Sequence, residues 1–394
     1  MPEQYDDRTG ARIAAHRKRS GLTQRGLAQR IPYSYSLLRH VEAGHKAPSP
    51  QLVAAVARAL GVPITALTGH SVHSLHPDHV AALIRPIREA LDLYDLPTDL
   101  YQPSATTADL VVAADALCRD VRAARLQQAA AALPSLLADL TMVCRDRPAT
   151  DAWRALSSAY RSAHDVATKF SYGDLAVRAL DRMGWATERA SDPVLGAVRQ
   201  YKRALSYRSR ESQYHVGLSM VAEGHRFLAQ AQVGTEASAV AGQLHLGAAV
   251  IAARADDGTA AEAHLGQARE LAARTGEVGT VYWLSFGPAN VGVHETFARL
   301  ELRQFDEAYA AARAVRPPRG WATSRRAAHL VDQARAEMET GRTDAALASL
   351  SLARKLAPQQ TRFQPRVRET VQGLLHMRRR SPDALSRMAT WVGC

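Results

Sequence analysis

The feature that most constrains this chain is a pattern of turn and helix that recurs within residues 106–394. The clearest copy runs from Gly341 to Pro358, with a polar turn, then Ala346, Leu350 and Ala353 on one helical face, then the proline. Fainter copies begin at Arg303, Asp256 and Tyr172. Helical pairs that repeat in this way cannot bury their apolar faces alone, so they stack into a superhelix with a concave binding groove.

The same pattern predicts the fold class. Each copy resembles the second half of a tetratricopeptide repeat, but the anchoring residues Ala261, Ala308 and Ala346 are 47 and 38 residues apart, so the repeats are irregular. The region shows no strand alternation. We therefore expect an all-α protein with three parts: a five-helix domain at residues 8–69, a linker with a connecting helix at 70–105, and an α-solenoid of degenerate tetratricopeptide-like hairpins at 106–394.

The net charge of +12 is unevenly distributed along the chain. Residues 1–69 hold ten basic and four acidic side chains, so half of the net charge lies in less than a fifth of the sequence. Only five of the 50 basic residues in the chain are lysines, so the abundance of arginine is partly a compositional bias. The concentration near the N-terminus is nevertheless what a module that binds a polyanion requires.

Cysteine content and hydropathy indicate the compartment. The three cysteines, Cys118, Cys144 and Cys394, are too few for a disulfide scaffold and favour a reducing cytoplasm. No apolar run is long enough for a membrane span, and the acidic first residues do not resemble a secretory leader. We expect a cytoplasmic protein with no membrane partner.

Glycines, a proline and capping hydroxyl residues divide residues 8–69 into a set of short helices. Gly21 and Gly44 end the first and third helices, and Thr23 and Ser34 are placed to cap the second and third. Ser49 and Pro50 start a fourth helix at residues 50–60, and a short fifth is expected around Ile64–Leu67. Two short helices joined by a tight turn within such a package form a helix-turn-helix.

The residues of this module resemble those of the phage-repressor (Xre/Cro) type of DNA-binding domain. The matching segments are Gly21-Leu-Thr-Gln24, Leu27-Ala28, Ser34-x-Ser36-x-Leu38, Val41-Glu42-x-Gly44, Pro48-Ser49 and Ala57-x-Ala59-Leu60-Gly61-Val62. The resemblance departs at Pro32, which stands where the family has a turn glycine and cannot take a positive φ, and at Gly26 inside the second helix. The turn must therefore adopt a different conformation, which could re-aim the third helix.

The resemblance implies a DNA-contacting set. It places Arg39 as the guanine reader, because a guanidinium fits O6 and N7 of that base, and it pairs Arg17 with Glu42 so that Arg17 is oriented toward phosphate. The alternative for Arg17 is a structural ion pair alone, and an exposed arginine is often only a solubilising charge. The implied contacts are Arg17, Thr23, Gln24, Tyr35, Ser36, Arg39, His40, His45 and Lys46.

The C-terminal region also resembles a family, the tetratricopeptide sensor half of actinobacterial Xre-type regulators. The likeness rests on His245-Leu246, Ala252-Ala253-Arg254, Phe286-Gly-Pro-Ala-Asn-Val291 and His294. It implies a groove that receives a small-molecule or peptide effector. The candidate ligand-binding residues are Trp283, Phe286, Asn290, His294, Arg254, Tyr214, His215 and His245. The structural alternative is a kinked, tightly packed helix pair in which Asn290 caps a loop.

No motif for catalysis or for a cofactor is present. The sequence lacks phosphate-binding glycine loops, nucleophile elbows and His-Glu-x2-His, so we expect neither an enzyme nor a cofactor. Four histidines recur every third residue in the linker, at His70, His73, His76 and His79. Pro77 interrupts them and no further ligand completes a site, which favours a solvated hinge over a metal site.

Two functional interpretations follow. In the first, the chain is a homodimeric transcriptional regulator that binds a pseudo-palindromic operator on double-stranded DNA, because a single small domain makes too few contacts for specific affinity. An effector in the superhelix then modulates operator affinity. In the second, DNA binding only localises the chain, and the repeat domain is a scaffold that binds a small partner protein constitutively.

Overall fold

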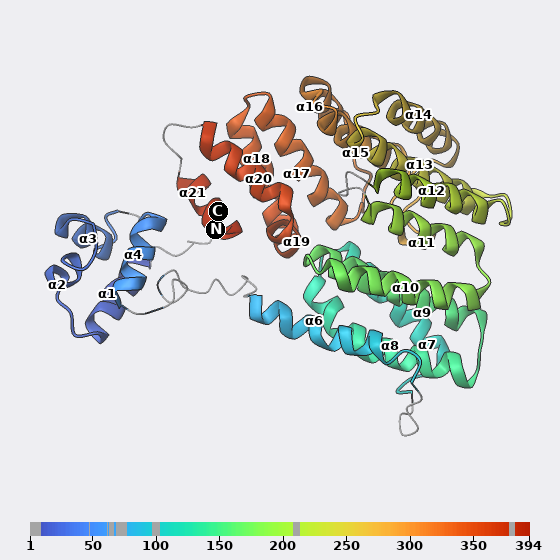
Figure 1. Ribbon diagram of the computed structural model, residues 1–394, viewed down its shortest axis with the longest axis horizontal. Helices are drawn as coiled ribbons and strands as arrows, with labels where there is room; N and C mark the ends of the chain where they lie inside the picture. Colours follow the sequence, from blue (N-terminus) through green and yellow to red (C-terminus); the bar gives the residue numbers. More distant parts are fainter. Residues whose placement is uncertain are drawn as a thin grey trace. The chain divides into compact units, whose positions relative to one another are not determined.

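The structure is a computed structural model that describes residues 9–46, 48–60, 62, 67, 77–96, 103–207, 213–377 and 383–394 (Figure 1). Across these residues the regular structure is helical, apart from one isolated antiparallel bridge between Val278 and Phe286. The predicted all-α fold class is confirmed. The chain forms two compact units, Met1–Leu75 and His76–Cys394, which are described separately below. No helix of the described residues is long and apolar enough to cross a membrane.

The N-terminal unit contains α1 (Thr9–Arg19), α2 (Gln24–Ala28), α3 (Tyr35–Glu42) and α4 (Pro50–Leu60). The second helix ends at Ala28, and most of the expected fifth helix lies outside the described residues. The three predicted hydroxyl caps are present. Thr23 Oγ1, Ser34 Oγ and Ser49 Oγ each accept a backbone N–H three residues ahead, at 3.0, 3.2 and 3.2 Å. Fully buried side chains from all four helices form one core, including Ile13, Leu27, Leu38, Leu52 and Val56.

A glycine sets the distance between α1 and α3. A Cβ atom on Gly10 would lie 1.9 Å from the carbonyl oxygen of Val41, so only glycine fits at this contact. The close approach of the two backbones brings the start of α1 beside the end of α3. Sequence periodicity alone gives no sign of this packing, because Gly10 lies inside a helix where glycine is otherwise unfavourable.

The turn before α3 has the different conformation that Pro32 was expected to impose. The Tyr33 N–H donates to the Ile31 carbonyl at 2.8 Å, a three-residue turn centred on Pro32. The fixed φ of proline suits such a turn. Positive φ values in the described part of this unit occur only at Gly21 and Gly44, so none is needed between α2 and α3. The predicted helix-turn-helix therefore forms without the usual turn glycine.

The C-terminal unit begins with α6 (Pro77–Asp92), which is the connecting helix expected within residues 70–105. Its repeating part begins with α7 (Thr107–Arg122), α8 (Leu126–Asp146), α9 (Thr150–Lys169), α10 (Gly173–Ala190), α11 (Pro193–Ser206), α12 (Tyr214–Leu228), α13 (Thr235–Arg254) and α14 (Gly258–Thr275). It continues with the 3-10 helix η2 (Val281–Trp283), α15 (Pro288–Glu301), α16 (Phe305–Ala314), α17 (Thr323–Glu339), α18 (Thr343–Leu356), α19 (Pro358–Phe363), α20 (Pro365–Met377) and α21 (Asp383–Val392).

These helices pack as successive hairpins, which Figure 1 shows following one another from α7 and α8 to α17 and α18. The first helices of neighbouring hairpins, α11, α13, α15 and α17, pack on each other in order. The anchors predicted from the repeat are buried where the helices of a hairpin meet: Ala176, Leu180, Ala261, Leu265, Ala268, Ala308, Ala312, Ala346, Leu350 and Ala353. The predicted solenoid of helical hairpins is confirmed.

One turn recurs between the two helices of a hairpin. Two residues before the second helix, the backbone takes a left-handed φ of +58° to +77°, at Ala124, Ser171, Asp256, Arg303 and Gly341. The next residue donates its N–H to the carbonyl five residues back, at 2.7–3.0 Å in all five turns. This is the hydrogen bond of a Schellman motif, which ends one helix and begins the next. The copy at Ala124 extends the repeat to a hairpin that the sequence pattern had missed.

The last helices return to an early hairpin. Lys169 Nζ at the end of α9 donates to Gln360 Oε1 on α19 at 2.9 Å, and Ser171 Oγ donates to the Phe363 carbonyl at 3.0 Å. The rings of Phe170 and Phe363 meet edge to face, 5.7 Å apart. The superhelix is therefore short and turns back on itself, unlike the open groove that the sequence suggested.

Candidate nucleic-acid interface and effector site

One side of α3 is buried in the core of the N-terminal unit and the other faces solvent. Leu38 and Val41 bury the inner side, and the Ser34 cap fixes where the helix begins. The exposed side chains are those assigned to DNA: Tyr35, Ser36, Arg39 and His40. Hydroxyl, guanidinium and imidazole groups on one face of a short helix have the chemistry that reads base edges in a major groove.

The loop after α3 keeps two further candidates beside that face. The N–H groups of His45 and Lys46 donate to the His40 carbonyl at 2.9 and 3.2 Å, across the turn at Gly44. The rings of His40 and His45 lie edge to face, and both side chains are exposed together with that of Lys46. These backbone hydrogen bonds hold the side chains of His40, His45 and Lys46 at one end of the helix.

The predicted ion pair between α1 and α3 is present and has a third member. Arg17 donates from Nε and Nη2 to the Glu42 carboxylate at 2.7 and 2.9 Å, and from Nη1 to the Leu22 carbonyl at 2.7 Å. The hydrogen bonds to Glu42 outweigh burial and raise the pKa of Arg17. Gln24 Nε2 also donates to Glu42, at 2.7 Å. Each nitrogen of Arg17 thus meets a protein acceptor, which supports the structural ion pair, while the contact of Arg17 with phosphate stays a prediction.

Sequence reasoning missed Arg25. This exposed residue in the first turn of α2 places its guanidinium 5.5 Å from the centre of the Tyr35 ring. Between residues 9 and 60 the chain contains nine basic residues and a single acidic one, Glu42, whose side chain is 3% exposed and neutralised by Arg17. The surface around α2 and α3 is therefore positive, with Thr23 and Gln24 at the start of α2 beside it.

In the C-terminal unit, Asn290 and His294 lie inside the protein. Arg325 Nε on α17 donates to Asn290 Oδ1 at 2.6 Å, and its Nη2 is 2.9 Å from His294 Nδ1. Asn290 Nδ2 donates to Gln243 Oε1 at 3.2 Å, and Gln243 Nε2 donates to the Tyr201 hydroxyl at 2.6 Å. Asn290 is 1% exposed. The expectation that Asn290 and His294 face an open groove is wrong, because this network joins α11, α13, α15 and α17.

Phe286 and Arg254 have structural surroundings as well. Phe286 is buried in the core cluster shared by α13, α14 and α15, and a Cβ on Gly242 would lie 2.0 Å from its ring. Arg254 pairs with Glu301 at 3.3 Å at the end of α15. Phe286 therefore packs in the core instead of lining a groove, and Arg254 has a carboxylate partner within the protein.

The remaining expected ligand residues do not gather with these. Tyr214 and His215 open α12, which packs on α11 and α13. His245 turns toward α12 and α14, where its ring lies 4.7 Å from that of His225, and its Nδ1 is 3.1 Å from that of His264. Among the described residues, no three His, Cys, Asp or Glu side chains are placed to hold a metal ion.

Trp283 lies on the segment Gly276–Gly287, here called the crossing loop, which joins α14 to α15. Val278 and Phe286 exchange two backbone hydrogen bonds of 2.7 and 3.0 Å and close its base. At its tip, Tyr282 and Trp283 adopt φ values of +42° and +54°, a left-handed conformation that costs about 1–3 kcal/mol per residue without glycine. Contacts elsewhere must therefore hold this tip in place.

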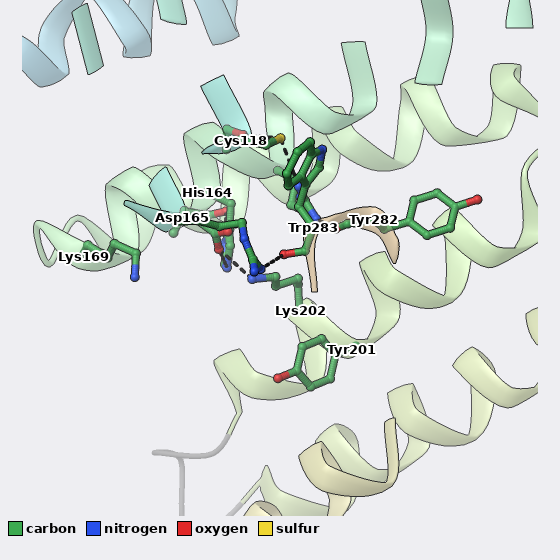
Figure 2. Close-up of polar contacts among 12 residues, drawn as sticks. Cys118, His164, Asp165, Lys169, Tyr201, Lys202, Tyr282 and Trp283 are labelled. Carbon is green, nitrogen blue, oxygen red and sulfur yellow. Dashed lines mark hydrogen bonds and ion pairs between the residues drawn. The ribbon is translucent and has the colours of Figure 1, made fainter. Parts of the chain in front are cut away.

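Those contacts come from three other helices. Trp283 Nε1 donates to Asp115 Oδ1 on α7 at 2.9 Å, and its carbonyl accepts from Arg122 Nη1 at 2.7 Å. The Tyr282 carbonyl accepts from Arg161 on α9, and its hydroxyl donates to Asp192 at 2.8 Å, the residue that caps α11. Figure 2 shows the two rings leaving the loop in different directions, Trp283 toward Cys118 on α7. The crossing loop thus contacts the first helix, or its capping residue, in each of the first three hairpins.

A partly buried ion pair lies next to the tip. Lys202 Nζ on α11 contacts Asp165 Oδ1 on α9 at 2.7 Å, as Figure 2 shows. Burial acts to raise the pKa of Asp165, but the charges of Lys202, His164 and Arg161 outweigh it and hold that pKa well below its usual range. This carboxylate is therefore ionised and already neutralised by Lys202.

Two cavities border the ends of the crossing loop. The larger, of about 660 Å³, lies between α15 and α16 and is lined by Gly292, Glu295, Arg299 and Glu307 among others. The smaller, of about 190 Å³, is lined by Arg122, Ser285, Arg319 and Trp321 among others. Glu277 lines both, and its carboxylate accepts the Ala289 N–H at 2.7 Å at the start of α15.

Comparison with known proteins agrees with the geometry of the N-terminal unit. A family model described as a helix-turn-helix domain matches residues 8–68. No curated protein matches the sequence. Among solved structures, the chain is similar to Bacillus thuringiensis PlcR in complex with the peptide PapR7 and DNA, at 12% identity and a TM-score of 0.31, over 78% of this chain and 93% of that one. So weak a likeness adds nothing to the fold, which rests on the hairpins described above.

Proposed function

We propose that the chain is a sequence-specific DNA-binding transcriptional regulator, a binding protein and not an enzyme. The observation that carries the proposal is the exposed face of α3, held over a core by the Arg17–Glu42–Gln24 network within a matched helix-turn-helix domain. A positive surface supplies affinity for the phosphate backbone, and the α3 side chains supply base preference. We also propose that the chain is an actinobacterial Xre-type regulator with tetratricopeptide-like repeats.

The regulator would act in the cytoplasm as a homodimer on a pseudo-palindromic operator. One small domain offers a single recognition helix, and specific affinity usually needs two half-sites about one helical turn apart. The C-terminal unit would set the spacing of the two domains, and a small-molecule or peptide effector would change it. Such regulation requires an effector that binds two states of the protein unequally.

The test of DNA reading is Arg39→Ala, measured by fluorescence anisotropy on a selected operator and on point variants of it. We expect a loss of about 1–3 kcal/mol in binding free energy and a relaxed preference at one base position. Arg58→Ala is the matched control, because Arg58 is exposed on α4 and outside the expected contact set. If Arg39→Ala weakens binding equally on every sequence, Arg39 contacts phosphate and the assignment as base reader is wrong.

The alternative is a DNA-tethered scaffold that binds a small partner protein constitutively. A stable, stoichiometric partner that stays bound with and without effector would favour it over sensing.

A further inference from the structure

Two arginines, Arg122 and Arg161, donate hydrogen bonds to backbone carbonyls of the crossing loop. Arg161 is 4% exposed; its Nη1 donates to the Tyr282 carbonyl and its Nη2 donates to the Cys118 thiol, while its buried Nε has no hydrogen-bond partner among the described residues. Arg122 donates only to the Trp283 carbonyl and the Ser285 hydroxyl among the described residues. No ion pair joins either guanidinium to a carboxylate in the described part of the chain.

The two cations also repel one another. Burial lowers the pKa of Arg122, and the positive charge of Arg161 lowers it further. Asp165, whose carboxylate interacts with the charge of Arg161, is already bonded to Lys202. Carbonyl and hydroxyl oxygens carry no charge, so they do not neutralise a guanidinium as a carboxylate or phosphate does, and they lack the bidentate geometry of those anions. The pair is therefore held by weaker partners than an anion would provide.

The segment that supplies these partners has a strained backbone at its tip and glycines at its ends. Its tip carries two consecutive non-glycine residues with positive φ, Tyr282 and Trp283, and its ends carry Gly276 and Gly287 with φ of +66° and +146°. Glycine tolerates such angles, so the ends can act as pivots. Backbone strain held by surrounding contacts is typical of ligand clamps and switch segments.

Space for a small group adjoins one member of the pair, Arg122. The cavity of about 190 Å³ is lined by Arg122 and by a further arginine, Arg319, which is exposed. Glu277 is the only acidic residue in its lining, and its carboxylate is engaged at the start of α15. The volume suits one anionic group of a ligand and not a whole drug-sized molecule.

We propose that Arg122 and Arg161 anchor an oxyanion of the effector, a carboxylate or a phosphate group, and that the crossing loop occupies this anchor in its absence. The oxyanion takes the place of the Tyr282 and Trp283 carbonyls. The loop tip is then released from Asp115 and Asp192, which lie on α7 and at the start of α11. This inference rests on the proposed sensing function and names the chemistry of its ligand.

The test is a titration of the full chain with inorganic phosphate and, separately, with acetate at constant ionic strength, followed by tryptophan fluorescence. All five tryptophans lie beyond residue 150, with Trp283 on the loop and Trp321 in the cavity wall, so the signal does not report anion binding by the N-terminal unit. We expect a saturable change that is reduced at least tenfold in apparent affinity by Arg122→Gln and by Arg161→Gln. Arg326→Gln, an exposed arginine on α17, should leave it unchanged.

Hydrogen exchange supplies a second readout in the same samples. The Val278 and Phe286 amides, which close the base of the loop, should exchange faster when phosphate or acetate is bound. If the Arg161→Gln variant fails to fold, the Arg122→Gln variant is compared with the wild type, because Arg122 is only half-buried. A response to phosphate alone identifies a phosphate group, and a response to acetate alone identifies a carboxylate.

The proposal is overturned if neither anion gives a saturable response, if both arginine variants respond as the wild type does, or if the loop amides become more protected. The titration contains no DNA. Its failure therefore leaves the DNA-binding proposal standing, and a failure to bind DNA leaves this site standing.

Discussion

Glu42 shows how one side chain organises the surface of the N-terminal unit. Its two oxygens hold Arg17 and Gln24 from different helices, so the only carboxylate between residues 9 and 60 is removed from the surface. The family resemblance predicted the Arg17 pair. It did not predict that Gln24 would join it or that Arg25 would lie over Tyr35, because those contacts depend on how α2 and α3 are oriented.

Gly10 offers a test at the residue scale. Gly10→Ala places a methyl group against the Val41 carbonyl, so α1 and α3 must separate, at a cost of about 1–3 kcal/mol. Hydrogen exchange of the α1 and α3 amides in the full chain measures the loss. Ala15→Ser, exposed on the same helix, should change protection by less than about 0.5 kcal/mol. Equal protection in Gly10→Ala and wild type would show that the two helices are not this close.

At the scale of elements, the sequence predicts best what is local. Hydroxyl caps, the glycine stops and the alanine anchors of the hairpins depend on residues a few positions apart, and the structure contains them. The hairpin turn at Ala124 was missed because alanine carries no signal for a left-handed φ. The crossing loop was missed because Arg122 and Trp283 are 161 positions apart, and no periodicity links them.

The left-handed turn between the two helices of a hairpin predicts that a substitution by glycine there increases stability. Ala124→Gly should stabilise the chain by about 1 kcal/mol, because glycine adopts the φ of +61° without the steric penalty of a Cβ. Ala132→Gly, exposed inside α8, should destabilise it by about 1 kcal/mol. Thermal unfolding of the full chain measures both. A loss of stability in Ala124→Gly comparable to that in Ala132→Gly would contradict the turn.

The three histidines on α12, α13 and α14 predict a loss of stability in acid. Burial, then the charges of His225 and His264, lowers the pKa of His245 to about 4, and burial also lowers the pKa of each of its two neighbours. The unfolded chain therefore binds protons first. Stability is complete above about pH 6.5 and falls as the pH is lowered toward about 4.

Urea unfolding midpoints between about pH 7 and about pH 5 measure this dependence. His245→Gln should flatten it, whereas His215→Gln, exposed on α12, should leave it as in the wild type. An unchanged slope in His245→Gln would mean that other groups govern the acid response.

At the scale of the whole molecule, the proposed DNA binding lies in the N-terminal unit and the proposed effector sensing in the C-terminal unit. The helix-turn-helix fold and its charge were predictable because local caps, apolar spacing and composition specify them together. The inside of the superhelix was not, since it depends on contacts between distant residues: α19 returns to the end of α9, and the crossing loop contacts α7. Of the eight expected ligand residues, Asn290, His294 and Phe286 are buried within the protein, and Trp283 instead anchors the loop.

The most direct test of the central claim is selection of fragmented genomic DNA by the purified full-length protein at physiological salt. The account predicts enrichment of one shared motif, arranged as two inverted half-sites whose spacing reports the dimer. Repeating the selection with Arg39→Ala should relax the preference at one position in each half-site. Equal recovery of all fragments, with and without phosphate or acetate, would contradict sequence-specific recognition by α3.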